Sequence, residues 1–258
     1  MSIHLSTGIF VYCIFLAIVI GSVLGSFLNC VAYRIAHGQS FLKGRSHCPK
    51  CNHVLGPLDL IPIFSWVFSK GKCRYCKEPI SIRYPLTELF MATMSVLCLL
   101  KFDLTLEFVR NYILLCCLFT LSLVDLDIFE IPDSCIILPI ITWVVTAPFL
   151  NENLISHVVS FFVYGFGVLV LSLIMDHFLH KESMGGGDIK LIAVMGLYLG
   201  IVGGLFGLFI ACLIGIILSF VSKKDEEMHF PFGPAISLAL WFVLLYGQPL
   251  IDWYVSLM

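Results

Sequence analysis

The chain has 258 residues, of which 59% are hydrophobic and only 12% are charged, and its mean hydropathy is +1.00. Soluble globular domains are nearer to a quarter charged, so this composition excludes an ordinary soluble protein and indicates an integral membrane protein. The formal net charge of −2 identifies no partner, because the distribution of the charges matters more than their sum.

Eight apolar segments are predicted to cross the membrane as helices. The first is preceded by no basic n-region in Met1–Gly8 and has no clear small-residue cleavage site, so we interpret it as a retained span and not as a signal peptide. A polar insert, residues 35–84, follows it. The predicted spans are roughly 8–34, 85–101, 108–126, 133–150, 156–179, 188–201, 204–222 and 231–250.

Residues 188–222 form one long apolar run, which we divide into two spans. The run has about 35 residues, whereas one helix needs only about 20 to cross the hydrocarbon core. Gly200, Gly203 and Gly204 lie where a turn would fall. Several small residues are also predicted to allow close packing between helices; they are Gly25, Ser26, Gly196, Gly203, Gly207 and Gly215.

Basic residues set the expected orientation, because they are enriched in cytoplasmic loops. The 35–84 insert carries eight Lys and Arg against Asp59 and Glu78, so we expect it in the cytoplasm and the N-terminus outside. The loops 127–132, 180–187 and 223–230 then also face the cytoplasm. Three lysines in these loops agree with this; they are Lys181, Lys223 and Lys224.

Two CxxC motifs in the insert predict a structural zinc site. Cys48 and Cys51 form one turn, Cys73 and Cys76 form the other, and two such turns can aim four thiolates at one tetrahedral Zn²⁺ ion. An insert of about 50 residues has too little core to fold alone, so a metal would stabilise it. Disulfides or redox-active pairs are the alternatives, and a cytoplasmic location disfavours disulfides.

Other metal-binding or reactive residues are less prominent. His47 and His53 could replace a thiolate, although four cysteines already complete the site. The seven remaining cysteines lie in or beside apolar spans and are interpreted as small buried hydrophobic residues; they are Cys13, Cys30, Cys98, Cys116, Cys117, Cys135 and Cys212.

Two aspartate clusters at the ends of apolar spans are the candidate catalytic groups. Asp125 and Asp127 close one span, and Asp188 opens another directly after three glycines. Ionisable groups at membrane depth are costly and usually mark function. Two carboxyl groups that share one proton can activate a water molecule. Residues two apart on a helix differ by about 200°, so Asp125 and Asp127 cannot both face Asp188.

Structural roles are also open for these residues. Asp133 and Asp188 could each be only the N-cap of the helix that follows. The glycines before Asp188 favour a functional role, because they allow unusual backbone angles and leave room for an extended peptide.

Five motifs in a fixed order resemble the bacterial type IV prepilin peptidase family, which belongs to the GxGD membrane aspartyl proteases. Gly186 stands where many relatives carry a larger residue, a departure that should not affect the chemistry. The motifs are Gly25–Asn29, the paired CxxC insert with Ile80–Pro85 and Glu88, Asp125–Asp127 with Ile131–Asp133, Gly185–Asp188, and Pro231–Pro234.

The resemblance implies a function. Asp125 and Asp188 would be the catalytic pair, with Asp127 facing away or in a supporting role. The enzyme would remove the basic leader of type IV prepilins or pseudopilins after a glycine, on the cytoplasmic side. The insert resembles that of bifunctional members, which then methylate the new N-terminus with S-adenosylmethionine. Residues 80–88 would lie near that activity, although Glu88 could instead pair with Arg83; the residues that bind the methyl donor are not identified.

The expected protein is therefore an all-α, multi-pass protein of the bacterial cytoplasmic membrane. We divide it into a first transmembrane helix (1–34), a four-cysteine zinc-binding insert associated with methylation (35–84), and a transmembrane protease bundle (85–258). Its expected partners are prepilin substrates and membrane lipid, with no nucleic acid.

The helix dipoles suggest how the two aspartates divide the work. Asp125 would be the acid, because it lies at the C-terminal end of its helix, and Asp188 the base, because it lies at an N-terminal end. We treat them as a coupled pair until a titration separates them.

Three other functions stay open. The chain could be a GxGD protease of other membrane helices without methyltransferase activity. It could be a zinc-bearing assembly factor for pili or secretion, with the aspartates as helix caps. A transporter that relays protons through Asp125 and Asp188 would need carboxylates deep within its spans, but both lie at span ends.

Overall fold

The computed structural model describes residues 7–40, 44–150, 152–180, 184–221 and 231–256. These ranges contain helices and two isolated β-bridges, so the prediction of an all-α fold is confirmed. The chain divides into two compact units, residues 1–108 and 109–258, which we describe separately. The lysines of the loops at 181–183 and 222–230, used above for the orientation, lie outside the described residues.

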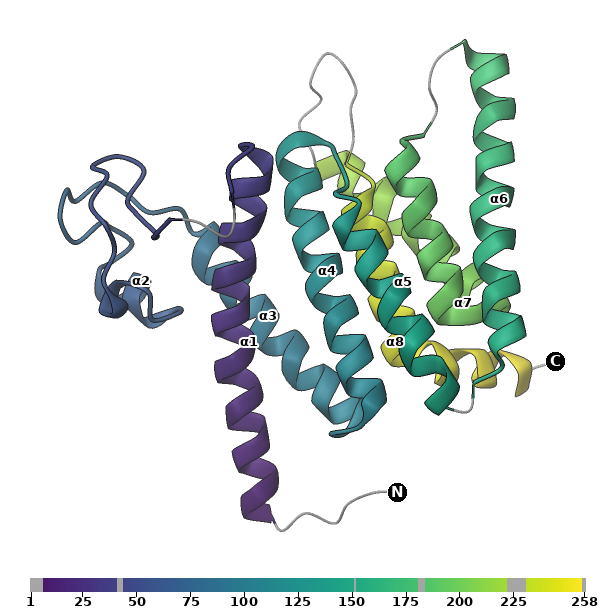
Figure 1. Ribbon diagram of the computed structural model, residues 1–258, viewed down its shortest axis with the longest axis horizontal. Helices are drawn as coiled ribbons and strands as arrows, with labels where there is room; N and C mark the ends of the chain where they lie inside the picture. Colours follow the sequence, from purple (N-terminus) through teal and green to yellow (C-terminus); the bar gives the residue numbers. More distant parts are fainter. Residues whose placement is uncertain (1–6, 41–43, 151, 181–183, 222–230, 257–258) are drawn as a thin grey trace. The chain divides into compact units, whose positions relative to one another are not determined.

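The first unit contains two long helices and the insert between them. The helices α1 (Thr7–Ala36) and α3 (Arg83–Phe102) pack along each other (Figure 1). The insert contributes a 3-10 turn, η1 (Pro57–Asp59), and the short helix α2 (Phe64–Phe68). Gly25 lets α1 approach α3, because a Cβ atom there would lie 2.9 Å from Cβ of Met91.

The second unit is a helical bundle. The helix α4 (Leu106–Ile128) enters it at Val109. After α4 come α5, η2, α6, α7 and α8, whose bounds are Ser134–Thr146, Ala147–Phe149, Leu154–Leu179, Gly186–Val221 and Gly233–Ser256. Extensive contacts join α7 to α6 and to α8 (Figure 1).

The apolar helices match the predicted spans. Five of the described helices are long and apolar enough to cross a membrane, namely α1, α3, α4, α6 and α7. Two shorter apolar helices, Ser134–Phe149 and Gly233–Gly247, occupy the places of the fourth and last predicted spans. With α7 counted as two segments, every predicted span has a helix, and the expectation of a multi-pass membrane protein is confirmed.

A sharp break at Gly200 divides α7. The φ and ψ angles there are 69° and −172°, a conformation open to glycine and strained for other residues. A Cβ atom on Gly207 would lie 2.7 Å from Sδ of Met195, although twelve residues of continuous helix span about 18 Å. The chain therefore turns back on itself. The predicted division into two helices is confirmed, with the break slightly earlier than expected.

Glycines bring α6 and α7 into close contact. A Cβ atom on Gly196 would lie 2.8 Å from the backbone oxygen of Ser160, and one on Gly204 would collide with the ring of Tyr164. Membrane helices lack a hydrophobic force between them, so close backbone approach through small residues is a main source of their packing energy. The predicted packing role is confirmed for Gly196.

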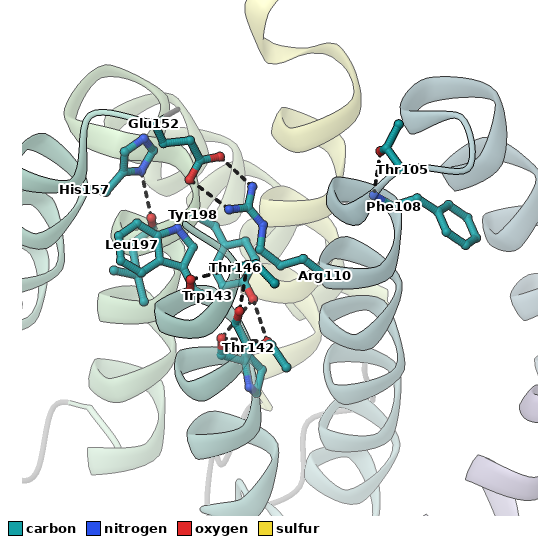
Figure 2. A network of polar contacts seen from close by, with 11 residues as sticks. Thr105, Phe108, Arg110, Thr142, Trp143, Thr146, Glu152, His157, Leu197 and Tyr198 are labelled. Atoms are coloured by element: carbon teal, nitrogen blue, oxygen red, sulfur yellow. Dashed lines mark hydrogen bonds and ion pairs between the residues drawn. The ribbon is translucent and has the colours of Figure 1, made fainter. Parts of the chain in front are cut away.

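A buried polar network ties four elements together at the end of the bundle away from Asp125 (Figure 2). The guanidinium of Arg110 donates to both carboxylate oxygens of Glu152, at 2.8 and 2.7 Å, and lies 5.6 Å from the ring centre of Tyr198. The hydroxyl of Tyr198 donates to the backbone oxygen of Pro139 at 2.9 Å. Because Arg110 is almost fully buried, losing Glu152 would leave an unpaired charge, a costly change.

We expect Gly196→Ala to destabilise the protein. The new methyl group would press on the backbone of Ser160, which can yield only if α6 moves, at a cost of about 1–3 kcal/mol. Thermal unfolding in detergent should show a midpoint lowered by several degrees. The matched control is Gly167→Ala in α6, where a Cβ atom meets nothing within 4 Å; equal effects of both changes would contradict the packing role.

Candidate functional site

The four cysteines of the insert converge on one point. The sulfur atoms of Cys48, Cys51, Cys73 and Cys76 all lie within 4.8 Å of one another, and those of Cys48 and Cys76 are 3.9 Å apart. Tetrahedral Zn²⁺ with Zn–S bonds of about 2.3 Å requires sulfur–sulfur distances of about 3.8 Å. The arrangement therefore fits a closed four-thiolate zinc site, which is structural because no position is left for a substrate.

The two CxxC turns are built alike. In each turn, the carbonyl oxygen of the first cysteine, Cys48 or Cys73, accepts a hydrogen bond from the N–H four positions later, at 2.9 and 3.0 Å. The donors, Asn52 and Lys77, both have positive φ angles, of 56° and 64°. An isolated β-bridge closes each turn. The same local fold is thus used twice, and each copy presents two sulfurs.

The four thiols of the cluster do not ionise alike without a metal. The backbone N–H of Cys51 lowers the pKa of the Cys48 thiol to about 7, against the opposing effect of burial. At Cys76 the N–H of Glu78 lowers the pKa, but burial and hydrogen bonds to the other sulfurs outweigh it and raise the pKa to about 12. A divalent metal ion is the group that allows all four thiols to ionise together.

The alternative ligands have other contacts. Nδ1 of His47 lies 3.3 Å from the backbone oxygen of Arg45, and the ring of His53 packs against that of Tyr75 with centroids 3.5 Å apart. Among the other cysteines, the interpretation as buried residues holds for several, but Cys212 is exposed on α7.

Glu88 connects the insert to α3. Its side chain is buried, and its Oε2 atom accepts a hydrogen bond of 2.6 Å from the backbone N–H of Ile63. Ile63 has a positive φ angle of 62°, so this bond holds a strained residue at the start of α2. One carboxylate oxygen of Glu88 is thus used for this backbone contact, and the suggested pairing with Arg83 stays a prediction.

Asp125 lies in the last turn of α4 and is buried, whereas Asp127 is exposed. This difference follows from the rotation of about 200° between residues two apart on a helix. The Oδ2 atom of Asp125 accepts a hydrogen bond of 2.9 Å from the backbone N–H of Gly233, at the start of α8. A Cβ atom on Gly233 would lie 2.7 Å from that oxygen, so the contact requires glycine.

Asp188 lies in the first turn of α7, two residues after its start at Gly186, and so it is not the N-cap. Its Oδ1 atom is buried and has no hydrogen-bond partner in the described part of the chain. The residue before it, Gly187, packs against Ile131, which also lies against Gly233 beside Asp125. The structure thus brings the two predicted catalytic residues together at one end of the bundle.

The side chain of Ile131 joins the two aspartate segments. A Cβ atom on Gly187 would lie 2.9 Å from Cβ of Ile131, and one on Gly233 would lie 3.3 Å from its Cδ1. Ile131 therefore contacts both the residue before Asp188 and the residue that donates to Asp125. Three segments that are far apart in the sequence meet here, around residues 125–131, 187–188 and 233.

An ion pair beside the site escaped the sequence analysis. Nζ of Lys190 lies 2.7 Å from Oδ1 of Asp133, and both side chains are more than half exposed. Asp133 is the N-cap of α5, as predicted, but its side chain makes no capping bond and pairs with Lys190. A single lysine close to the start of an otherwise apolar run was the signal for this pair.

Comparisons with known proteins cover most of the chain. The family described as "Bacterial Peptidase A24 N-terminal domain" matches residues 19–102, and the "Type IV leader peptidase family" matches residues 112–220. No solved structure matches the chain significantly.

Several curated proteins named "Prepilin leader peptidase/N-methyltransferase" are similar along most of their length. The protein of Bacillus subtilis (strain 168) is 31% identical, over 93% of this chain and 96% of its own. The protein of Neisseria gonorrhoeae is 30% identical, over 93% of this chain and 94% of its own. The protein of Aeromonas salmonicida (strain A449) is 30% identical, over 90% of each chain.

Replacing one cysteine of the cluster should release the metal. We expect Cys73→Ser to lose the zinc that the unaltered protein carries, because three thiolates bind Zn²⁺ much more weakly than four. Metal analysis of the purified protein measures this. The matched control is Cys212→Ser, which should keep a full complement of zinc; an unaltered protein free of zinc would rule out the site.

Proposed function

The chain belongs to the type IV leader peptidase family, and from this premise we propose that it cleaves the leader from type IV prepilins or pseudopilins. The cut follows a glycine, and two-aspartate catalysis performs it. The observation that supports the proposal is that Asp125 bonds to Gly233 and that Ile131 packs against both Gly233 and Gly187, the residue before Asp188, at one end of a transmembrane bundle. The names of the relatives support the same activity.

Two carboxyl groups suffice for the chemistry of peptide hydrolysis. One of them, ionised, takes a proton from a water molecule that attacks the scissile carbonyl carbon; the other, protonated, donates to the carbonyl oxygen or the leaving amine. The helix dipoles favour Asp125 as the acid, but Gly233 also donates to Asp125, so the dipoles are not the only influence. We therefore describe the pair as one coupled dyad.

The glycine segment before Asp188 suits an extended substrate. Gly185 and Gly186 are exposed, and a Cβ atom on Gly186 would meet nothing within 4 Å. A peptide bond inside a helix is shielded by its own hydrogen bonds, whereas the glycine at the cleavage site lies before the apolar helix of the pilin. That extended residue can approach the aspartates while the helix stays in the lipid.

The proposed location is the bacterial cytoplasmic membrane, with the site facing the cytoplasm. Eight basic residues in the 35–84 insert favour a cytoplasmic insert. The spans that follow it end or begin near Asp125, Asp188 and Gly233 on the same side. This orientation puts the protease site where the basic leader of a prepilin would remain.

We also propose that the chain methylates the new N-terminal residue, as the names of its relatives indicate. S-adenosylmethionine would supply the methyl group. A cavity of about 280 Å³ in the insert is lined by Lys70, Lys72, Arg74 and Lys77, and four cations do not suit a sulfonium cation. We therefore assign no residues to the methyl donor. The segments 1–34, 35–84 and 85–258 stay our proposed division, with the insert associated with methylation.

Conservative changes at the dyad should abolish cleavage. We expect Asp125→Asn and Asp188→Asn each to lower the cleavage rate of a co-expressed prepilin by at least about 10²- to 10⁴-fold, because an amide can neither take nor give the proton. Mass spectrometry of the pilin reports the cut and the N-methyl group together. Asp127→Asn is the control and should keep activity. Full cleavage by either dyad variant would show that the altered aspartate is not catalytic, whereas no cleavage by the unaltered protein would favour a zinc-bearing assembly factor.

A methyl group at Gly233 should disturb the dyad without touching its chemistry. We expect Gly233→Ala to slow cleavage by about 10²-fold, since the new atom would push Asp125 aside by an ångström or so. Gly186→Ala, where the added atom meets nothing, should cleave at nearly the normal rate. Initial rates in detergent, at equal zinc content, compare the two; similar rates would show that the Gly233 contact does not position Asp125.

A further inference from the structure

The short helix α2 in the insert exposes an unusual apolar surface. Phe64, Val67 and Phe68 are 60%, 54% and 79% exposed, and the two phenylalanine rings pack together at a centroid distance of 6.3 Å. Trp66 lies on the other side, where its Nε1 donates to the backbone oxygen of Ile80 at 3.1 Å. The helix is thus anchored by one side and offers three large apolar residues on the other.

Two contacts place α2 where α3 begins. The backbone N–H of Ile63, directly before α2, donates to Glu88, and Glu88 lies five residues, about 7.5 Å, into α3. The bond from Trp66 to Ile80 holds the middle of α2 against the segment that leads into α3. Since α3 is apolar and long enough to cross a membrane, α2 lies at the level where that helix enters the bilayer.

Positive charge surrounds the apolar surface. Phe68 lines the cavity of about 280 Å³ together with Lys70, Lys72, Arg74 and Lys77. Arg74 pairs with Asp59 at 3.3 Å, whereas the three lysines form no ion pair with any described residue. Exposed aromatic residues beside unpaired lysines are typical of surfaces that rest on anionic lipid headgroups.

We propose that this surface docks on the anionic phospholipid of the bilayer that holds α3. The docking face comprises Phe64, Val67 and Phe68, which enter the interface, and Lys70 and Lys72, which bind lipid phosphate at the cavity. The same charges exclude the basic leader of a prepilin as the occupant. Docking holds the zinc insert against the membrane surface, and it stands whether or not the proposed protease activity does.

A competing role for the lysines is to stabilise the zinc site, because a zinc ion with four thiolates carries a net charge of −2. Neighbouring cations would stabilise such a site. Lys70 and Lys72 would then serve the metal and not the lipid. The two roles differ in what their removal changes, namely zinc content in one case and lipid contact in the other.

Photo-crosslinking in nanodiscs tests the docking face. The full chain carries p-benzoylphenylalanine in place of Phe68, and the discs contain either phosphatidylcholine alone or an equal mixture with phosphatidylglycerol. After irradiation, mass spectrometry identifies what is attached at position 68. We expect lipid adducts, on the order of tenfold more abundant in the anionic discs. The proposal is overturned if position 68 is attached only to protein, including a second copy of the chain. It is also overturned if the two kinds of disc give equal amounts of lipid adduct.

A matched pair of variants tests the lysines. Lys70→Gln with Lys72→Gln should lower the lipid adducts on the order of tenfold in anionic discs and leave zinc content unchanged. Arg45→Gln with Lys101→Gln removes the same charge from exposed positions away from the docking face and should change neither. The proposed lipid contact of Lys70 and Lys72 is overturned if both double variants lose lipid adducts equally. It is also overturned if the double variant at Lys70 and Lys72 loses zinc.

Discussion

The hydrogen bond from the N–H of Gly233 to Asp125 joins residues 108 positions apart, and the rest of the candidate site depends on it. It fixes the start of α8 against the end of α4, and only glycine allows so close an approach. Ile131 touches both Gly233 and Gly187. The position of Asp188, next to Gly187, is therefore set by the same contact. The donor is a backbone group, so the bond is lost only if the side chain of Asp125 turns away or the start of α8 moves.

The two units of the chain are stabilised by different means. The bundle of residues 109–258 relies on close glycine contacts and on the buried pair of Arg110 and Glu152, which suits a medium without a hydrophobic driving force between helices. The insert is too small for a large core. Its two similar turns instead present four sulfurs to one point, and the bond between Ile63 and Glu88 joins it to α3. A metal bound to these sulfurs would, together with the membrane helix, replace a core.

Periodicity, length and glycine placement predict most of this fold from the sequence. The division of α7 near Gly200 followed from the length of a membrane crossing, and the opposite exposure of Asp125 and Asp127 followed from the helical repeat. The partners of polar groups were harder to predict. Gly233 donates to Asp125 from 108 residues away, and the side chain of Asp133 pairs with Lys190 instead of making a capping bond. Such contacts depend on tertiary packing, and the local sequence shows at most that a charged residue in an apolar run, such as Lys190, needs a partner.

The break at Gly200 has a further physical effect. The segment from Gly186 to Leu199 has fourteen residues and rises only about 21 Å, whereas the hydrocarbon layer is about 30 Å thick. Hydrophobic mismatch of this size is relieved by local thinning of the lipid. Water then comes nearer to Asp188 than the length of a full crossing would permit, which is what a hydrolytic reaction within a membrane requires.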